Sequence, residues 1–196
     1  MRGLNSIFPI PIFIDKAEGS EYTAIQEELT IARNKIKFND TGSNMVLNDN
    51  PFENNILNDY QCNHTLNFIN KNIKSYIDSL YSKSSVKWEV INAWMTKTLN
   101  GRSSREHHHG HTNISGVYYL DTNGNDGTLV FPNIHSHLAA NILLEGIVEK
   151  DVTMPLGNGI IILWPGQLRH RTQVNETDHE RISISFNISV RSSDIV

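Results

Sequence analysis

The stretch Arg181-Ile182-Ser183-Ile184-Ser185-Phe186-Asn187 alternates polar and apolar residues without a break. Successive side chains of a β-strand point to opposite faces of its sheet, so the alternation predicts a strand with one polar and one apolar face. Arg181 belongs to the polar face of this well-buried strand. A buried arginine is costly unless it meets an anion, and its planar guanidinium suits a carboxylate. The strand therefore predicts an anion site, and a structural ion pair is the alternative reading of Arg181.

Several other short strands are expected in the second half of the chain, separated by turns rich in Gly and Asn. They are Trp88–Met95, Ser115–Leu120, Thr128–Phe131 and Ile160–Trp164, and the quoted stretch extends to Val190. Short strands at this spacing are typical of a sandwich or a barrel. The long connection Asn133–Asp151 is expected to be a lid or a binding element. It contains His135 and His137, which we interpret first as loop residues.

The first half has the spacing of helices instead. Apolar residues recur every three or four positions, which marks one face of a helix, in two sets: Ile25, Leu29, Ala32, Ile36 and Leu66, Ile69, Ile73, Ile77, Leu80. Thr65 is the expected N-cap of the second helix. The asparagine-rich stretch Asn39–Asn55 is expected to be a loop. The stretch Ser6–Ile14, interrupted by two prolines, is expected to form an edge strand rather than a signal segment.

These patterns predict an α+β fold, mainly β, in a single domain spanning residues 1–196. Residues 1–86 form a helical support region and residues 87–196 form the strand core. The chain has 196 residues, 38% of them hydrophobic, and a net charge of -4, which argues against disorder and does not favour nucleic-acid binding. The single cysteine, Cys62, excludes an internal disulfide and is expected to be a buried apolar residue. With no apolar run of membrane-spanning length, a cytoplasmic protein without membrane partners is expected.

Four of the nine histidines lie in Glu106-His107-His108-His109-Gly110-His111. If this run is a strand, His107 and His109 point to the same side and His108 points away. Two imidazoles on one face are a candidate pair of metal ligands, and His170, after the strand Ile160–Trp164, is the candidate third. A strand break would shift the pair to His109 and His111, and a solvated loop is the non-functional alternative.

Four motifs occur in an order that resembles one known family. They are Phe8-Pro9-Ile10-Pro11, then Ala93-Trp94, then a His-x-His ahead of Ser115-Gly116-Val117-Tyr118-Tyr119, and finally Pro165 and His170 before Arg181–Asn187. Together they resemble the 2-oxoglutarate- and iron(II)-dependent oxygenases, especially the prolyl-hydroxylase-like branch. They are most similar to uncharacterised 2OG-Fe(II) oxygenases found in bacteria and phages. The resemblance covers nearly the whole chain.

The resemblance implies a double-stranded β-helix, or jelly roll, with the N-terminal helices packed on one sheet. It implies that His107, His109 and His170 hold Fe(II). It also implies a 2-oxoglutarate pocket, in which Arg181 and Ser183 bind the far carboxylate, Tyr119 bonds the same carboxylate, and Asn92 and Trp94 line the wall.

One position departs from the pattern of the wider superfamily. The usual triad there is two histidines and one carboxylate, and His109 stands where Asp or Glu is expected. The most similar family shares the His-x-His, so iron remains the expected metal. Three neutral imidazoles leave the full +2 charge of the metal for the dianionic cosubstrate to offset. Three histidines are also an arrangement that holds zinc. Glu106 would replace His109 only by breaking the strand geometry.

The implied activity is hydroxylation of a substrate C–H bond with Fe(II), 2-oxoglutarate and O₂. The substrate is unidentified, and peptidyl proline and a small molecule are both compatible with the resemblance. A cupin-like three-histidine dioxygenase that does not use 2-oxoglutarate is one alternative, and Arg181 discriminates against it. A catalytically inactive metal-binding module is the other. The sequence does not indicate an oligomeric state.

Overall fold

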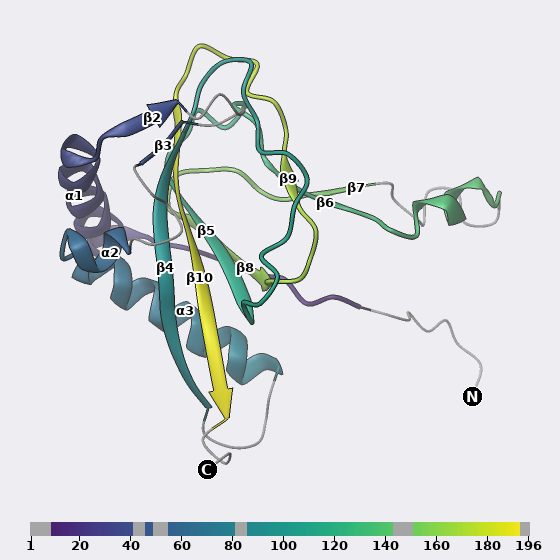
Figure 1. The fold of residues 1–196 in the computed structure, drawn as a ribbon, viewed down its shortest axis with the longest axis horizontal. Coiled ribbons are helices and arrows are strands. Elements are labelled where there is room, and N and C mark those ends of the chain that lie inside the picture. The colour runs from purple at the N-terminus through teal and green to yellow at the C-terminus, as the bar shows by residue number, and fades with distance from the viewer. Residues whose placement is uncertain (1–8, 41–45, 49–54, 81–85, 143–150, 193–196) are drawn as a thin grey trace.

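A computed structural model describes residues 9–40, 46–48, 55–80, 86–142 and 151–192. Its centre consists of two antiparallel sheets (Figure 1). The seven-stranded sheet has the order β1-β8-β5-β10-β4-β3-β2, with bounds β1 Phe13–Lys16, β2 Phe38–Asp40, β3 Val46–Asn48, β4 Val86–Thr98, β5 Ile114–Asp121, β8 Ile160–Pro165 and β10 Arg181–Ser192. The smaller sheet has the order β7-β6-β9, with bounds β6 Leu129–Pro132, β7 Asp151–Thr153 and β9 Arg171–Thr172. This is the mainly β, double-stranded β-helix architecture that the sequence predicts.

Helices cover one face of the seven-stranded sheet (Figure 1). They are α1 Gly19–Lys35, α2 Ile56–Asp59 and α3 Asn63–Leu80. The larger apolar core joins helical residues such as Leu29 and Phe68 to strand residues such as Ile184. A smaller core lies between the sheets, where Tyr119, Phe131 and Trp164 pack together. The helices therefore close the outer face of the large sheet and leave its inner face to the second sheet.

β10 occupies the middle of the large sheet, between β5 and β4. As the alternation predicts, Ile182, Ile184 and Phe186 belong to the core shared with the helices. Arg181 and Ser183 are also buried, but they line the cavity between the two sheets. The alternation of one strand thus separates the apolar core from the cavity.

The predicted loop Asn39–Asn55 is wrong in part, because two short strands occupy some of it. β2 extends to Asp40, and β3 pairs with both β2 and β4 at the far edge of the sheet. Residues 41–45 and 49–54 of this stretch lie outside the described residues. These strands form because their backbones pair with neighbouring strands. Asparagine is depleted in strands, so the composition of this stretch did not predict them.

Thr65 is not the N-cap of the second helix, because α3 begins at Asn63. Glu28 of α1 supplies the missing acceptor instead. Its carboxylate accepts hydrogen bonds from the backbone N–H groups of His64 (2.8 Å) and Thr65 (2.9 Å) and from the Thr65 hydroxyl (3.0 Å). A carboxylate at a helix N-terminus also meets the positive end of the helix dipole. The cap comes from another helix, which a search of the local sequence does not reveal.

The first part of the chain is more than a helical support, since β1, β2 and β3 all join the large sheet. β1 forms its edge and pairs with β8, as expected for the proline-containing N-terminal segment; residues 1–8 lie outside the described residues. Residues 133–142, the first part of the predicted connection Asn133–Asp151, leave the barrel as an arm that carries the 3₁₀ helix η1, Ser136–Ala140 (Figure 1). Residues 143–150 of this connection lie outside the described residues. None of the helices in the described part of the chain combines the length and the apolar composition that a membrane crossing demands.

Candidate metal centre

Two backbone contacts bring the sequence-distant histidines together. His107 and His170 form an isolated antiparallel bridge, in which each backbone N–H donates to the other residue's carbonyl at 2.9 Å. The His109 N–H donates to the Gly166 carbonyl at 2.8 Å. The segment His107–His109 is therefore not the regular strand that the sequence analysis considered. Gly110 follows this segment with a positive φ of +54°, and the chain turns there.

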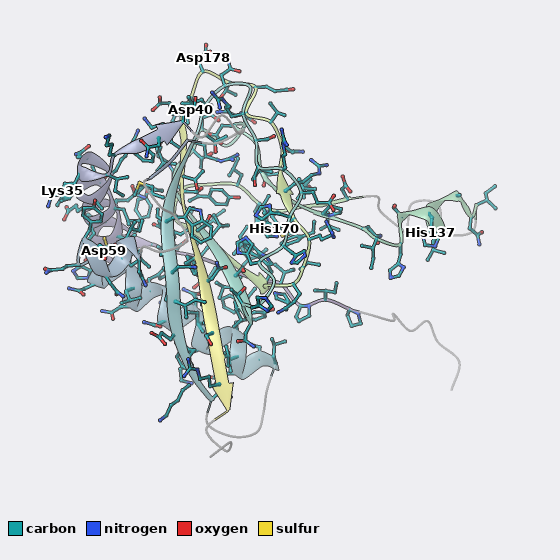
Figure 2. All side chains as sticks on the ribbon, in the orientation of Figure 1. Lys35, Asp40, Asp59, His137, His170 and Asp178 are labelled. Carbon is teal, nitrogen blue, oxygen red and sulfur yellow. The ribbon has the colours of Figure 1, made fainter. Side chains whose placement is uncertain are left out.

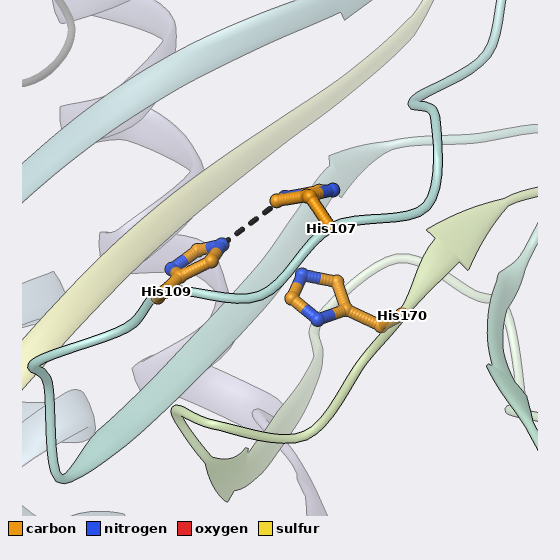
Figure 3. Close-up of side chains that lie close together, drawn as sticks. All are labelled: His107, His109 and His170. Carbon is orange, nitrogen blue, oxygen red and sulfur yellow. Dashed lines mark hydrogen bonds between the residues drawn. The ribbon is translucent and has the colours of Figure 1, made fainter. Parts of the chain in front are cut away.

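The three imidazoles converge on one point (Figure 3). One nitrogen from each of His107, His109 and His170 lies within 4.8 Å of the other two. The Nε2 atoms of His107 and His109 are 3.2 Å apart. Two nitrogens that share a metal at about 2.0–2.1 Å, at angles between octahedral and tetrahedral, are separated by roughly 3.0–3.4 Å. The spacing of this pair therefore matches a shared metal ion.

Each histidine has its other ring nitrogen tied to an oxygen. His107 Nδ1–H donates to the Arg105 carbonyl at 2.7 Å, and His170 Nδ1–H donates to the Leu168 carbonyl at 2.9 Å. His109 Nδ1 lies 2.5 Å from the side-chain oxygen of Asn187. A proton on Nδ1 leaves the lone pair of Nε2 available, so all three rings present the nitrogen that a metal binds.

The environment keeps the two inner rings uncharged. Burial lowers the pKa of His170 to about 3, with the Leu168 carbonyl opposing and His107 adding to the shift. Burial also lowers the pKa of His109, and the hydrogen bond that His109 donates to Asn187 opposes this shift. Metal ligation requires neutral imidazole. At pH 7 these rings are therefore ready to bind a cation.

The other predicted histidines stay apart from this cluster. His108 Nδ1 accepts the Gly110 N–H, and His111 is exposed. Figure 2 shows His137 on the arm, well away from His170. Glu106 does not replace His109, because its carboxylate accepts from Arg169 at the surface.

The three histidines line the cavity between the sheets together with four of the five proposed cosubstrate residues. The lining includes Trp94, Tyr119, Arg181 and Ser183 together with Thr96 and Thr98. The Trp94 ring lies 5.8 Å from that of His109, centroid to centroid. Asn92 is the exception, because it is not among the lining residues. It pairs with Asn187 along β10, one step beyond Trp94 on the same face of β4.

Arg181 is 2% exposed and lines the same cavity as the three histidines. Its Nη1 donates to the carbonyls of Asp126 (2.6 Å) and Gly127, and its Nη2 donates to the Thr98 hydroxyl at 3.1 Å. Its Nε–H has no hydrogen-bond partner among the residues that the structure describes. Within that part of the chain Arg181 also forms no salt bridge. The guanidinium is thus held by neutral oxygens and keeps an unpaired donor for an anion.

Tyr119 lies beside this arginine on β5, opposite Ser183 of β10. Burial raises the pKa of the Tyr119 phenol, and the charge of Arg181 opposes that shift. The phenol is therefore protonated at neutral pH and can donate a hydrogen bond into the cavity.

Sequence reasoning missed three residues around the histidines. Asn187 had been placed on the polar face of its strand, but its contact with His109 depends on a separate chain segment. Trp164 and Phe131 had been read only as strand residues. Their rings lie 4.9 and 6.2 Å from that of His170, centroid to centroid, and 5.6 Å from each other. Tertiary contacts alone reveal these aromatic neighbours.

The cavity of this double-stranded β-helix combines three convergent imidazoles, two of which are kept uncharged by burial, with a buried arginine. These groups suit a metal ion and an anionic ligand. Comparison with known proteins gives the family. Residues 92–187, which contain the three histidines and Arg181, match the family model described as "Putative 2OG-Fe(II) oxygenase". This match confirms the resemblance read from the motifs. A search of curated proteins gives no significant match.

Solved structures share the fold at low sequence identity. HygX from Streptomyces hygroscopicus, with nickel, 2-oxoglutarate and hygromycin B bound, is 11% identical with a TM-score of 0.64, covering 92% of this chain and 83% of that one. A Pseudomonas putida prolyl-4-hydroxylase is 11% identical with a TM-score of 0.59, covering 92% of each chain. A Burkholderia pseudomallei oxidoreductase of the 2OG-Fe(II) oxygenase family is 9% identical with a TM-score of 0.59, covering 89% and 92%.

Proposed function

We propose that this protein is a 2-oxoglutarate-dependent iron(II) oxygenase that hydroxylates a C–H bond of its substrate. The observation that carries the proposal is a single cavity lined both by three convergent imidazoles and by Arg181, whose Nε–H has no partner among the described residues. A metal needs the first and a carboxylate needs the second. The family match over the same residues supports this assignment.

The donor set fits Fe(II) and 2-oxoglutarate. His107, His109 and His170 would hold the metal through Nε2. Arg181 would bind the distant carboxylate through the edge that its contacts with Asp126 and Gly127 leave unused. Together with O₂, iron(II) and 2-oxoglutarate supply the oxidation of a C–H bond to C–OH, with release of succinate and CO₂.

The surrounding residues would orient the cosubstrate and exclude water. Ser183 and Tyr119 face each other across paired strands, so their hydroxyls would share the carboxylate with Arg181. Trp94 and Trp164 form apolar walls of the cavity. Inside such a poorly hydrated space, the attraction between guanidinium and carboxylate is stronger than in water. The protein's own contribution is therefore placement and shielding.

Substitution of Arg181 tests the cosubstrate site. We expect Arg181→Ala to weaken 2-oxoglutarate binding by about 30-fold or more, because truncating one partner of a buried charge pair costs ~2–5 kcal/mol. Calorimetric titration of the zinc- or nickel-loaded protein with 2-oxoglutarate measures this. Arg33→Ala is the matched control, since Arg33 of α1 pairs with Asp121 outside the cavity. Unchanged 2-oxoglutarate affinity in Arg181→Ala would contradict the proposal.

The choice of metal needs its own experiment, because three histidines also suit zinc. Anaerobic addition of Fe(II) and then 2-oxoglutarate is expected to give the weak visible charge-transfer band of a chelated cosubstrate. Tight zinc binding without such a band would favour an inactive metal-binding module. A band of the same intensity at the same 2-oxoglutarate concentration in Arg181→Ala would contradict the proposed role of Arg181 in holding the cosubstrate.

The substrate is proposed to enter through an apolar groove of about 450 Å³, because one residue of its lining, Phe131, also lies near His170, with 6.2 Å between the ring centroids. The groove is lined by residues just before β1, by residues of β6 and β7, and by the segment after β8. Examples are Ile12, Phe131 and Leu168. HygX is bound to hygromycin B, whereas another neighbour is a prolyl-4-hydroxylase. Both a small molecule and peptidyl proline therefore remain proposals for this chain. Succinate release, measured across pools of peptides, amino acids and nucleic acids, identifies the class.

A further inference from the structure

The three histidines are oriented in two different ways. His107 and His170 donate their Nδ1–H to backbone carbonyls, those of Arg105 and Leu168. His109 has no such carbonyl and meets the side chain of Asn187 instead, at 2.5 Å. Backbone carbonyls are present whatever the side chain, whereas the partner of His109 depends on one residue type. The orientation of His109 is therefore the one of the three that a single substitution can remove.

Asn187 is itself held in place. Its side-chain oxygen accepts a second hydrogen bond from the Ser115 hydroxyl, at 2.8 Å, and Ser115 Oγ also lies 3.3 Å from the Thr112 hydroxyl. Ser115 is fully buried and Asn187 is 5% exposed. An amide oxygen has two lone pairs, so Asn187 can accept from both neighbours at once. This chain of contacts directs an acceptor, not a donor, at His109.

We propose that Asn187, positioned by Ser115, fixes the proton of His109 on Nδ1 and so compensates for a histidine at the position where iron(II) oxygenases with the usual triad have a carboxylate. A carboxylate ligand has no tautomer to choose and needs no such partner. A neutral imidazole has two tautomers, and only the one protonated on Nδ1 offers its Nε2 to the metal. Asn187 is thus a positioning residue that acts through His109.

The opposite orientation of the Asn187 amide makes a different prediction. If its NH₂ group faced His109, the ring would accept on Nδ1 and carry its proton on Nε2, which points at the metal position. Ser115 then would have to accept or lose its contact. Long-range ¹H–¹⁵N spectra of the metal-free protein distinguish these tautomers, because protonated and unprotonated ring nitrogens resonate far apart. We expect His109 to be protonated on Nδ1.

Zinc titration of variants tests the energetic consequence. Asn187→Leu removes the acceptor and is expected to weaken zinc(II) binding by about 10–100-fold, the usual effect of losing such a partner. Its His109 spectrum is expected to shift toward the Nε2-protonated form. Asn187→Asp keeps an acceptor oxygen and is expected to restore both the Nδ1 tautomer and most of the zinc affinity. Wild-type affinity and tautomer in Asn187→Leu would overturn the inference.

Asn72→Leu is the matched control. Asn72 is a buried asparagine of α3 whose side chain donates to the Phe68 carbonyl, on the helix side of the sheet. The Asn72→Leu variant is expected to be less stable than the unsubstituted protein, with no change in zinc affinity. If Asn187→Leu does not fold, Ser115→Ala is measured in its place. A smaller loss of zinc affinity is expected for Ser115→Ala, and an unchanged zinc affinity would overturn the inference.

The inference rests on the proposed metal site and not on 2-oxoglutarate. The two failures are distinguishable. If the unsubstituted protein does not bind zinc(II) or iron(II), the proposed function fails. If it binds the metal and Asn187→Leu binds equally well, only the role of Asn187 fails.

Discussion

On the helix-covered face of β10, Ile182, Ile184 and Phe186 have no exposed surface and pack with α1 and α3. On the opposite face Arg181 and Asn187 are almost as deeply buried, at 2% and 5% exposure. The first group contacts carbon atoms. The second contacts carbonyls, hydroxyls and an imidazole. Burial is therefore nearly the same on both faces of one strand, and only the chemistry of the neighbours tells the core from the site.

The two faces also differ in what they contribute. Burial of apolar area stabilises the fold by about 25 cal/mol per Å². Burial of a polar group costs free energy unless every donor and acceptor is paired. Arg181 Nε and Trp164 Nε1 lack partners among the described residues, and both belong to residues that line the cavity. The polar groups of the cavity face therefore stabilise the fold less than apolar groups would, but they are available to bind a ligand.

The largest effect is expected on the helix-covered face. Phe186 lies against Gly116 and has no exposed surface. Phe186→Ala should lower the free energy of unfolding by about 3–5 kcal/mol, through lost burial and the cavity left behind. Denaturant unfolding of the metal-free protein measures it. If zinc affinity fell while stability did not, the two faces would not be separate in function.

The cavity face should behave in the opposite way. His170→Ala removes a proposed ligand and is expected to weaken metal binding by more than about 100-fold, beyond the loss caused by an orienting partner. The free energy of unfolding of the metal-free protein should fall by less than about 1.5 kcal/mol. The ring donates one hydrogen bond, to the Leu168 carbonyl, and the net contribution of one such bond is of that size. Zinc titration and denaturant unfolding are measured on the same samples. A larger loss of stability than of metal affinity would make His170 a structural residue.

The smallest effect concerns Cys62, which is buried on the helix side. Burial, and then the charge of Glu28, raise the pKa of its thiol to about 11 from its ordinary value of 9.0. As pH rises above 9 the unfolded state loses this proton first, so the stabilising contribution declines until the folded thiol also ionises near pH 11. A thiol reagent at pH 8 should therefore react slowly until denaturant is added. Rapid reaction in the native state would show that water reaches the helix-side core.

Periodicity and spacing determined much of this protein. The alternation of Arg181–Asn187 placed Arg181 on the inner face and Phe186 on the outer, and helical spacing located α1 and α3. These predictions succeeded because side-chain direction follows from backbone geometry within one element. The order of four motifs also gave the family, which the match of residues 92–187 confirms.

Other features depended on contacts between elements that no local pattern records. β3 exists because β4 pairs with it, and the cap of α3 comes from Glu28 of another helix. His107 and His109 converge with His170 through backbone bonds to distant residues and not through a regular strand. The sequence alone proposed which residue types would form the site. Only the tertiary structure decided that Asn187 faces His109 and that Arg181 keeps an unpaired donor, because hydrogen-bond partners are set by distances between segments far apart in the chain.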